Sequence, residues 1–325
     1  MHLIVPFAGT VSAAGQQALH TLSLPHLDRL LSRLSPGAVL GSDEFSPNTP
    51  HEQALALALG WPANPQTLPD VALPWAAQRA GELGLLDTGL AQAAWGLLTP
   101  VHLQVGAELA TLTEPEGLQL DDAQSRELLN IVRPLFETEG FTLHWAGPLQ
   151  WLATHALFDG LATASLDRVT GRNVDPWLPD HRNSRLLRRL QNEVQMLLHN
   201  HAVNDRREAV GLATVNSVWL SGCGRAPAAT VAVTAAMTTA PAPGFQVDDR
   251  LRAPALAEDW AAWCEAWRAL DAGPIQQLLQ TGASAQLTLC GERCALPFTA
   301  QPQNLWQRAA GLWRKPSIHR VLEGL

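Results

Sequence analysis

Residues 184–227 read SRLLRRLQNEVQMLLHNHAVNDRREAVGLATVNSVWLSGCGRAP and decide the fold of this chain. In the first half, apolar residues recur at steps of three and four, which predicts one buried helical face; they are Leu186, Leu187, Leu190, Val194, Leu197 and Leu198. Ser184 is the predicted N-cap, because its hydroxyl can accept a hydrogen bond from a first-turn amide. The second half predicts a buried strand over 214–220 that runs into a tight glycine turn at 221–224.

This strand and its glycines form the predicted site. In open α/β sheets, ligands bind outside the carboxyl ends of strands, where backbone amides can point outward. We therefore assign candidate ligand contacts to the glycines and to nearby polar side chains, namely Asn204, Arg207, Asn216, Gly222 and Gly224. Asn216 falls inside the predicted strand, where an amide needs either a buried hydrogen-bond network or a ligand. Cys223 is not expected to be a nucleophile, because no phosphatase-type loop surrounds it.

Arginines gather just before the strand. Six lie at positions 168, 172, 182, 185, 188 and 189, against Asp175 and Asp180. The planar guanidinium suits phosphate and carboxylate groups, which favours an anionic ligand or an acidic protein partner. A solvated helix face with local ion pairs is the alternative. We expect Arg168, Arg172 and Arg225 to converge on the carboxyl end of the strand, and we include Asn173, from the turn-forming run 171–176, in the ligand set.

Composition limits the class of protein. The 325 residues are 46% hydrophobic and 16% charged, with a net charge of −8, which argues against binding to nucleic acid or to an anionic membrane. No apolar run has the length of a membrane helix, and residues 3–7 are expected to form a first buried strand instead of a signal peptide. Four cysteines without CxxC spacing suit a reducing cytoplasm. We expect one α/β domain over 1–325, with a subdivision into 1–120 and 121–325 and a variable connection at 226–243 as the alternative.

Periodicity elsewhere completes the expected α/β fold, a central mixed or mostly parallel sheet flanked by helices. The expected helices are 24–34, 51–59, 75–83, 121–140 with a break or kink at Pro134, a helix from Pro148 through Leu157, 256–270 and 305–313. The expected strands are 3–7, 102–105, 108–112, 141–145 and a hairpin over 285–298. A tryptophan stripe in helix 256–270 is interpreted as core. His199 and His201 lack a carboxylate partner, so no metal site is expected there.

A family resemblance rests on residues 192–227. The residues that carry it are Asn192-Glu193-Val194, His201-Ala202-Val203-Asn204, Arg207, Gly211, Val215 to Leu220 and Gly222 to Pro227. This run resembles the archaeal type of cofactor-independent phosphoglycerate mutase, in the alkaline phosphatase superfamily, where a similar run leads a core strand into the substrate region. The chain, including DGLATASLDRVTGRNVD and SGCG, also resembles a family of bacterial proteins labelled phosphoglycerate mutase or regulatory protein of the pathogenicity-factor E type.

The sequence departs from that family at the implied metal site. The resemblance implies two metal ions held by aspartates and histidines, since two-metal phosphoryl transfer needs hard anionic ligands, together with a serine or threonine nucleophile. It also implies an aspartate at the end of the first strand, yet Leu3-Ile4-Val5 is followed by Pro6-Phe7-Ala8-Gly9. A late Asp-His-Gly run is absent, and Asp180-His181 is the only Asp-His pair. We therefore expect no metal, no other cofactor and no assignable catalytic residue.

Three functions remain open. The first is a mutase-like protein without the two-metal site that binds a phosphorylated or carboxylated small molecule, or acts as a regulatory protein. The second is an active phosphoglycerate mutase or related phosphoryl-transfer enzyme with relocated ligands. The third is an interaction module whose arginine-rich loop docks an acidic protein. Metal analysis of the purified protein separates the second function from the other two.

Overall fold

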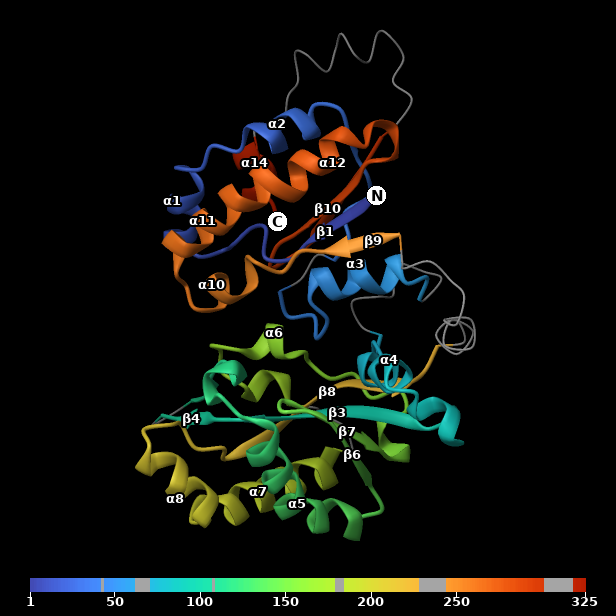
Figure 1. Cartoon of the computed structure of the whole chain (residues 1–325), viewed down its shortest axis with the longest axis vertical. Coiled ribbons are helices and arrows are strands. Elements are labelled where there is room, and N and C mark those ends of the chain that lie inside the picture. The colour runs from blue at the N-terminus through green and yellow to red at the C-terminus, as the bar shows by residue number, and fades with distance from the viewer. Residues whose placement is uncertain (42–43, 62–70, 107–108, 179–183, 228–243, 301–317) are drawn as a thin grey trace. The chain divides into compact units, whose positions relative to one another are not determined.

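The computed structural model describes residues 1–41, 44–61, 71–106, 109–178, 184–227, 244–300 and 318–325 (Figure 1). The chain divides into two compact units, one of Met1–Pro69 with Pro241–Leu325 and one of Asp70–Ala240. The predicted helix at 305–313 and most of the variable connection at 226–243 lie outside the described residues. The single-domain organisation stays a prediction. No helix among the described residues is long and apolar enough to cross a membrane.

The first unit is built on a five-stranded mixed sheet in the order β2-β11-β10-β1-β9. Its strands are β1 His2–Val5, β2 Ser35–Pro36, β9 Phe245–Val247, β10 Gln286–Cys290 and β11 Ala295–Thr299. β1 runs parallel to both β10 and β9, whereas β11 is antiparallel to β10 and to β2. Its helices are α1 Ala13–Leu19, α2 Pro25–Leu31, α3 Pro50–Ala58, α10 Arg252–Leu256, α11 Trp260–Leu270, a π-helical turn at Asp271–Ile275, α12 Gln276–Gln280, a 3-10 turn at Gly282–Ser284 and α14 Ile318–Glu323.

β1 is buried on both faces, which explains its unbroken apolar sequence. Leu3 and Val5 belong to the larger core of this unit, whereas Ile4 belongs to a smaller cluster on the other face, with Ala54 of α3. The tryptophan stripe of α11 is core, as predicted. Trp263 and Trp267 are fully buried, and their rings meet edge to face with centroids 6.1 Å apart.

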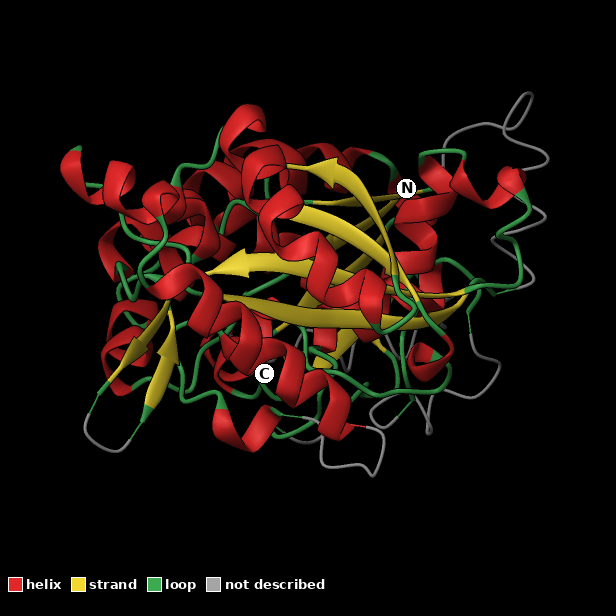
Figure 2. Ribbon diagram, turned by 90° about the horizontal axis from the view of Figure 1, so that it is seen from below, coloured by secondary structure: helices red, strands yellow, loops and turns green. Residues whose placement is uncertain are grey.

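The second unit is built on a four-stranded antiparallel sheet in the order β6-β7-β3-β8. Its strands are β3 Ala94–Val101, β6 Thr142–Gly147, β7 Gln150–Thr154 and β8 Ser217–Arg225, and β4 Leu103–Val105 pairs with β5 Ala110–Leu112 as a separate hairpin (Figure 2). Its helices are α4 Trp75–Glu82, α5 Asp122–Thr138, α6 Leu166–Val169, α7 Ser184–His199 and α8 Ala202–Ala209, with 3-10 turns at Leu85–Thr88, Pro115–Leu118, Ala156–Phe158 and Asp175–Trp177. Helices α5, α7 and α8 cover one face of the sheet, and α4 and α6 lie on the other (Figure 1).

The predicted α/β class, with a central mixed sheet flanked by helices, is confirmed. Two element predictions are wrong. Residues 150–154 form strand β7 and not part of a helix, because Trp151, Leu152 and Ala153 fill the centre of the sheet with all three side chains buried. The strand predicted at 214–220 begins later and continues through the glycines to Arg225.

Candidate functional site

The glycines of residues 221–224 lie inside β8, which is at the edge of the sheet that the described residues form, and make a bulge. The predicted tight turn is wrong: β8 pairs with β3 from Ser217 to Arg225, and its register shifts where Trp95 and Leu97 face it. Gly222 and Gly224 have φ angles of +61° and +141°, which other residues adopt at a cost. An added Cβ on Gly222 would lie 3.0 Å from the backbone nitrogen of Ala76. The glycines therefore let the start of α4 pack against the strand.

Two predicted ligand residues, Asn204 and Asn216, hold the backbone around the start of β8. The Nδ2 of Asn204 donates to the carbonyls of Leu198 and Val215 at 2.9 and 2.8 Å, and its Oδ1 accepts from the Val215 amide. Asn216 exchanges two hydrogen bonds with the backbone of Leu103, at 2.8 and 2.9 Å. These contacts satisfy each side-chain amide within the protein, which is the buried-network alternative left open by the sequence.

Arg207 holds the same region from α8. It is 2% exposed, its Nε donates to the Ala213 carbonyl at 2.8 Å, and its Nη1 donates to Gln124 at 2.6 Å. Its Nη2 donates to the carbonyl of Leu118. Burial lowers the pKa of this guanidinium, and the carboxylate of Asp121 opposes that shift. Arg207 thus fastens α8 to the segment before α5.

The candidate arginines and Asn173 lie at two ends of the sheet. Arg168 is 2% exposed and stacks over the Trp177 ring, with its guanidinium carbon 5.9 Å from the ring centroid. Asn173 forms a bridge with β5, and its Oδ1 accepts from the amide of Asp175. The backbone carbonyl of Arg172 accepts from the Leu112 amide of β5. These three residues therefore share the neighbourhood of the β4–β5 hairpin, which follows the carboxyl end of β3.

Arg225 lies at the opposite end of β3 from that hairpin. It faces Ala94 at the start of β3, donates to Asp159 at 2.9 Å and also donates to the carbonyl of Gln92. Ala94 and Val101 are separated by seven residue steps, or about 23 Å at roughly 3.3 Å per residue. The structure does not bring Arg225 together with Arg172, and a ligand role for each stays a prediction.

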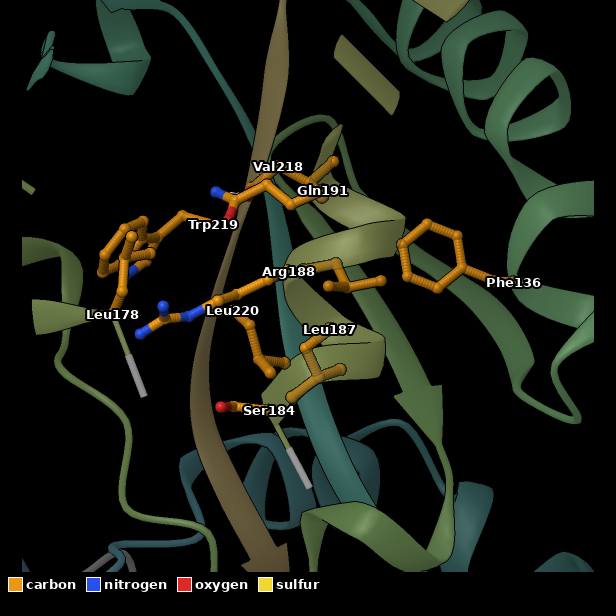
Figure 3. Close-up of a pocket in the computed structure, with 10 residues that line it drawn as sticks. Phe136, Leu178, Ser184, Leu187, Arg188, Gln191, Val218, Trp219 and Leu220 are labelled. Carbon is orange, nitrogen blue, oxygen red and sulfur yellow. Dashed lines mark hydrogen bonds between the residues drawn. The ribbon is translucent and has the colours of Figure 1, made fainter. Parts of the chain in front are cut away.

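A cleft between α7 and β8 was not found by sequence reasoning. It holds about 500 Å³ of atom-free space, part of it open to solvent. Six apolar side chains form most of the lining, namely Leu98, Phe136, Leu178, Leu187, Val218 and Leu220, and Trp219 adds to it. The polar lining comes from α7, as Ser184, Arg188 and Gln191 (Figure 3). We call this the α7–β8 cleft. The sequence signal for this cleft was the predicted helix with arginines on its exposed face. That signal was incomplete, because the sequence does not reveal which strand lies beside the helix.

The carboxyl edge of β1, in the first unit, is where the resemblance places a metal ligand. Phe7 stands there with a φ of +54°, its carbonyl accepts from the indole of Trp263 at 3.0 Å, and its ring lies 5.3 Å from that of His51. The carboxylate after β9, on Asp248, forms a two-pronged ion pair with Arg250 at 2.7 and 2.8 Å. The carboxylate after β10, on Glu292, accepts from the amide of Val11 at 3.0 Å.

These residues do not fit a two-metal centre. The residues that directly follow β1 are apolar. The carboxylates that follow the neighbouring strands, those of Asp248 and Glu292, already bind other groups of this chain. Within the described residues, no group of three His, Cys, Asp or Glu side chains is placed to hold a metal ion.

A hydroxyl–imidazole pair beside this edge was also missed. Thr49 precedes α3, its Oγ1 lies 3.2 Å from the Nε2 of His51, and the same hydroxyl donates to Glu52 at 2.8 Å. The amide of Thr49 donates to the same Glu52 oxygen at 2.8 Å. The sequence signal was the run Thr-Pro-His-Glu, which combines an N-cap, a proline in the first turn and a glutamate three residues after the cap.

Cys223, in β8, is not an activated thiol. It is 1% exposed, and burial raises its pKa to about 12, while a hydrogen bond to Thr163 opposes the shift. A thiol that stays protonated is a poor nucleophile, in agreement with the prediction.

Comparison with known proteins gives partial similarities. No family model matches the chain. A stretch of 109 residues, 33% of this chain, is 27% identical to a probable 2,3-bisphosphoglycerate-independent phosphoglycerate mutase of Geobacter sulfurreducens, and spans about a quarter, 27%, of that protein. The PH0037 protein of Pyrococcus horikoshii aligns over 92% of this chain and 87% of its own, with 13% identity and a TM-score of 0.41. The cofactor-independent phosphoglycerate mutase of Thermoplasma acidophilum aligns over 100% and 99%, with 12% identity and a TM-score of 0.32.

Proposed function

We propose that this chain is a phosphoglycerate mutase-like protein without the two-metal site, which binds a phosphorylated or carboxylated small molecule and acts as a regulatory protein. The carrying observation is the carboxyl edge of β1. Where the resemblance calls for an aspartate, Phe7 is fixed by its left-handed backbone, by the bond from Trp263 and by its contact with His51. The partial identity to a probable mutase supports the family part of the proposal.

Turnover and binding together test this function. The protein should show no interconversion of 3- and 2-phosphoglycerate when manganese or zinc is added, under conditions in which a cofactor-independent mutase assayed in parallel is active. 3-Phosphoglycerate or inorganic phosphate should nevertheless raise the melting temperature, because a ligand that binds only the folded state stabilises it. Metal-dependent turnover would contradict the loss of the metal site. The absence of any shift with either compound would contradict the ligand class.

An active phosphoryl-transfer enzyme is the second candidate, and one observation favours it. The Thr49 hydroxyl donates to Glu52 and also lies 3.2 Å from the Nε2 of His51, next to the carboxyl edge of β1, so two groups able to act as a base lie within reach of this hydroxyl. If turnover is found, Thr49→Val should abolish it and Thr49→Ser should retain it, since serine keeps both the hydroxyl and the helix cap. Equal turnover in Thr49→Val and the parent would exclude this hydroxyl.

A further inference from the structure

Residues 318–325, which we call the strap, pack into the first unit at the carboxyl ends of two parallel strands. β1 and β10 run side by side with Val5 opposite Leu289, so their carboxyl ends lie at one edge of the sheet. Leu322 and Leu325 are the buried side chains of the strap, 1% and 3% exposed, and both belong to the larger core of this unit. Open α/β sheets bind their ligands outside this edge.

Two glycines let the strap approach the edge. A Cβ on Gly291, which directly follows β10, would lie 2.5 Å from the Cβ of Leu325 and 2.6 Å from its backbone oxygen. A Cβ on Gly9, in the loop after β1, would lie 2.3 Å from the backbone oxygen of Leu322. Neither glycine has a positive φ, so it is the close approach of the strap that requires glycine at both positions.

Two consecutive backbone amides hold the strap at this edge. The N–H groups of Arg293 and Cys294 both donate to the backbone oxygen of Leu325, at 2.9 and 3.1 Å. The carboxylate of Glu292, beside them in the sequence, accepts from the amide of Val11 at 3.0 Å. Successive amides that converge on one oxygen are an arrangement that binds anions. The strap therefore lies in an arrangement of donors that suits a carboxylate or phosphate oxygen.

We propose that the amides of Arg293 and Cys294 form an anion-binding site, and that the strap competes for this site with a small carboxylate or phosphate ligand. The inference rests on the function proposed above, because it gives the phosphorylated or carboxylated ligand a place in the chain. In the closed state the Leu325 oxygen takes the position of one oxygen of the ligand headgroup. The ligand binds once the strap has left, so its apparent affinity is reduced to the fraction of molecules in which the strap is open.

The strap has the properties of a segment that can leave. Its helix, α14, has six residues, which is too short for a helix to be stable on its own. Its outer contact is the ion pair of Glu323 with His20 at 3.2 Å, and the His20 side chain is 62% exposed. Exposed ion pairs contribute little to stability. The strap is therefore held mainly by its two buried leucines and by the pair of amides.

Calorimetric titration with 3-phosphoglycerate and, separately, with inorganic phosphate tests the competition. Leu325→Ala should bind the ligand at least about tenfold more tightly than the parent, because the loss of a buried leucine weakens the closed strap. Leu322→Ala should do the same, and it serves if Leu325→Ala does not fold. In the parent, ligand should accelerate hydrogen exchange in residues 318–325, since the bound state leaves the strap open.

Two further variants separate competition from a general loss of packing. Leu30 of α2 is 1% exposed in the same core, so Leu30→Ala removes a similar side chain outside the strap and should bind as the parent does. Gly291→Ala fills the place of the Leu325 oxygen. It should accelerate exchange in the strap without raising the affinity, because the new Cβ obstructs the ligand too.

The outcomes distinguish this inference from the function on which it rests. If the parent binds ligand and the strap variants bind no more tightly than Leu30→Ala, competition by the strap is overturned and the proposed function stands. If Gly291→Ala gains affinity as Leu325→Ala does, the two amides are not the site. If neither compound binds the parent or any variant, the inference and the proposed ligand class are both overturned.

Discussion

Replacing Gly222 by alanine should destabilise the second unit through two separate costs. Its φ of +61° lies in the left-handed region, which costs an L-residue about 1–2 kcal/mol. The new Cβ would also lie 3.0 Å from both the Ala76 nitrogen and the Trp75 Cβ, so the first turn of α4 must shift by a few tenths of an ångström. Overpacking of this kind costs about 1–3 kcal/mol. We expect a total loss of about 2–5 kcal/mol.

Gly211 separates the two costs. Its φ is +79°, and a Cβ built on it meets no atom within 4 Å. Gly211→Ala should therefore show the backbone cost alone, about 1–2 kcal/mol. Urea unfolding followed by far-ultraviolet circular dichroism gives both changes in free energy, and hydrogen exchange of α4 and β8 locates the effect.

The comparison of these variants can refute the packing argument. If Gly222→Ala loses no more stability than Gly211→Ala, then α4 does not rest on the bulge. The same conclusion follows if hydrogen exchange in α4 is unchanged in Gly222→Ala.

Three further predictions concern buried polar groups. Asn204→Leu leaves two carbonyls and one amide without their partner, and should cost about 2–4 kcal/mol in urea unfolding, whereas an unchanged midpoint would contradict the network. Burial lowers the pKa of His2, His144 and His155 below the usual 6.5, so the folded state binds fewer protons than the unfolded state. The stability should therefore be full above about pH 6.5 and decline as the pH falls below that value. Melting temperatures measured between pH 8 and pH 5 test this, and a flat profile would contradict it. Cys223 should resist iodoacetamide at about pH 8 until the protein unfolds, and rapid labelling of the native protein, mapped by peptide mass, would contradict its burial.

The sequence predicted correctly those elements in which buried apolar residues recur at a regular spacing. The heptad-like spacing of α7 and the tryptophan stripe of α11 each indicated one apolar face, and the structure buries Leu190, Val194, Trp263 and Trp267. Residues 150–154 were mistaken for helix because the segment is short, and a short apolar run fits a buried strand as well as a helix. Helix α8 was missed because Asn204, Asp205 and the arginines that follow give it no apolar stripe.

The candidate site was harder to predict from the sequence than the fold, for a physical reason. Glycines after a strand can make a turn or a bulge, and only the pairing partner distinguishes the two; here β3 lies opposite through Arg225. The side chains of Asn204 and Asn216, which the sequence suggested as ligand contacts, form hydrogen bonds to the backbone instead. The spacing of residues along the sequence does not reveal such contacts. The α7–β8 cleft depends on which helix lies beside which strand edge, and so it required the tertiary structure.

Metal stoichiometry tests the central proposal, that the carboxyl edge of β1 holds no two-metal centre. The protein, purified without chelator, is dialysed against manganese and against zinc, passed through a desalting column and measured by elemental analysis. A cofactor-independent mutase treated identically serves as the positive control. We predict less than one equivalent of either metal, because the residues that follow β1, Pro6 to Gly9, offer no metal-binding side chain, and the carboxylates of Asp248 and Glu292 bind other groups of the chain. Two equivalents, as two-metal phosphoryl transfer requires, would contradict the account.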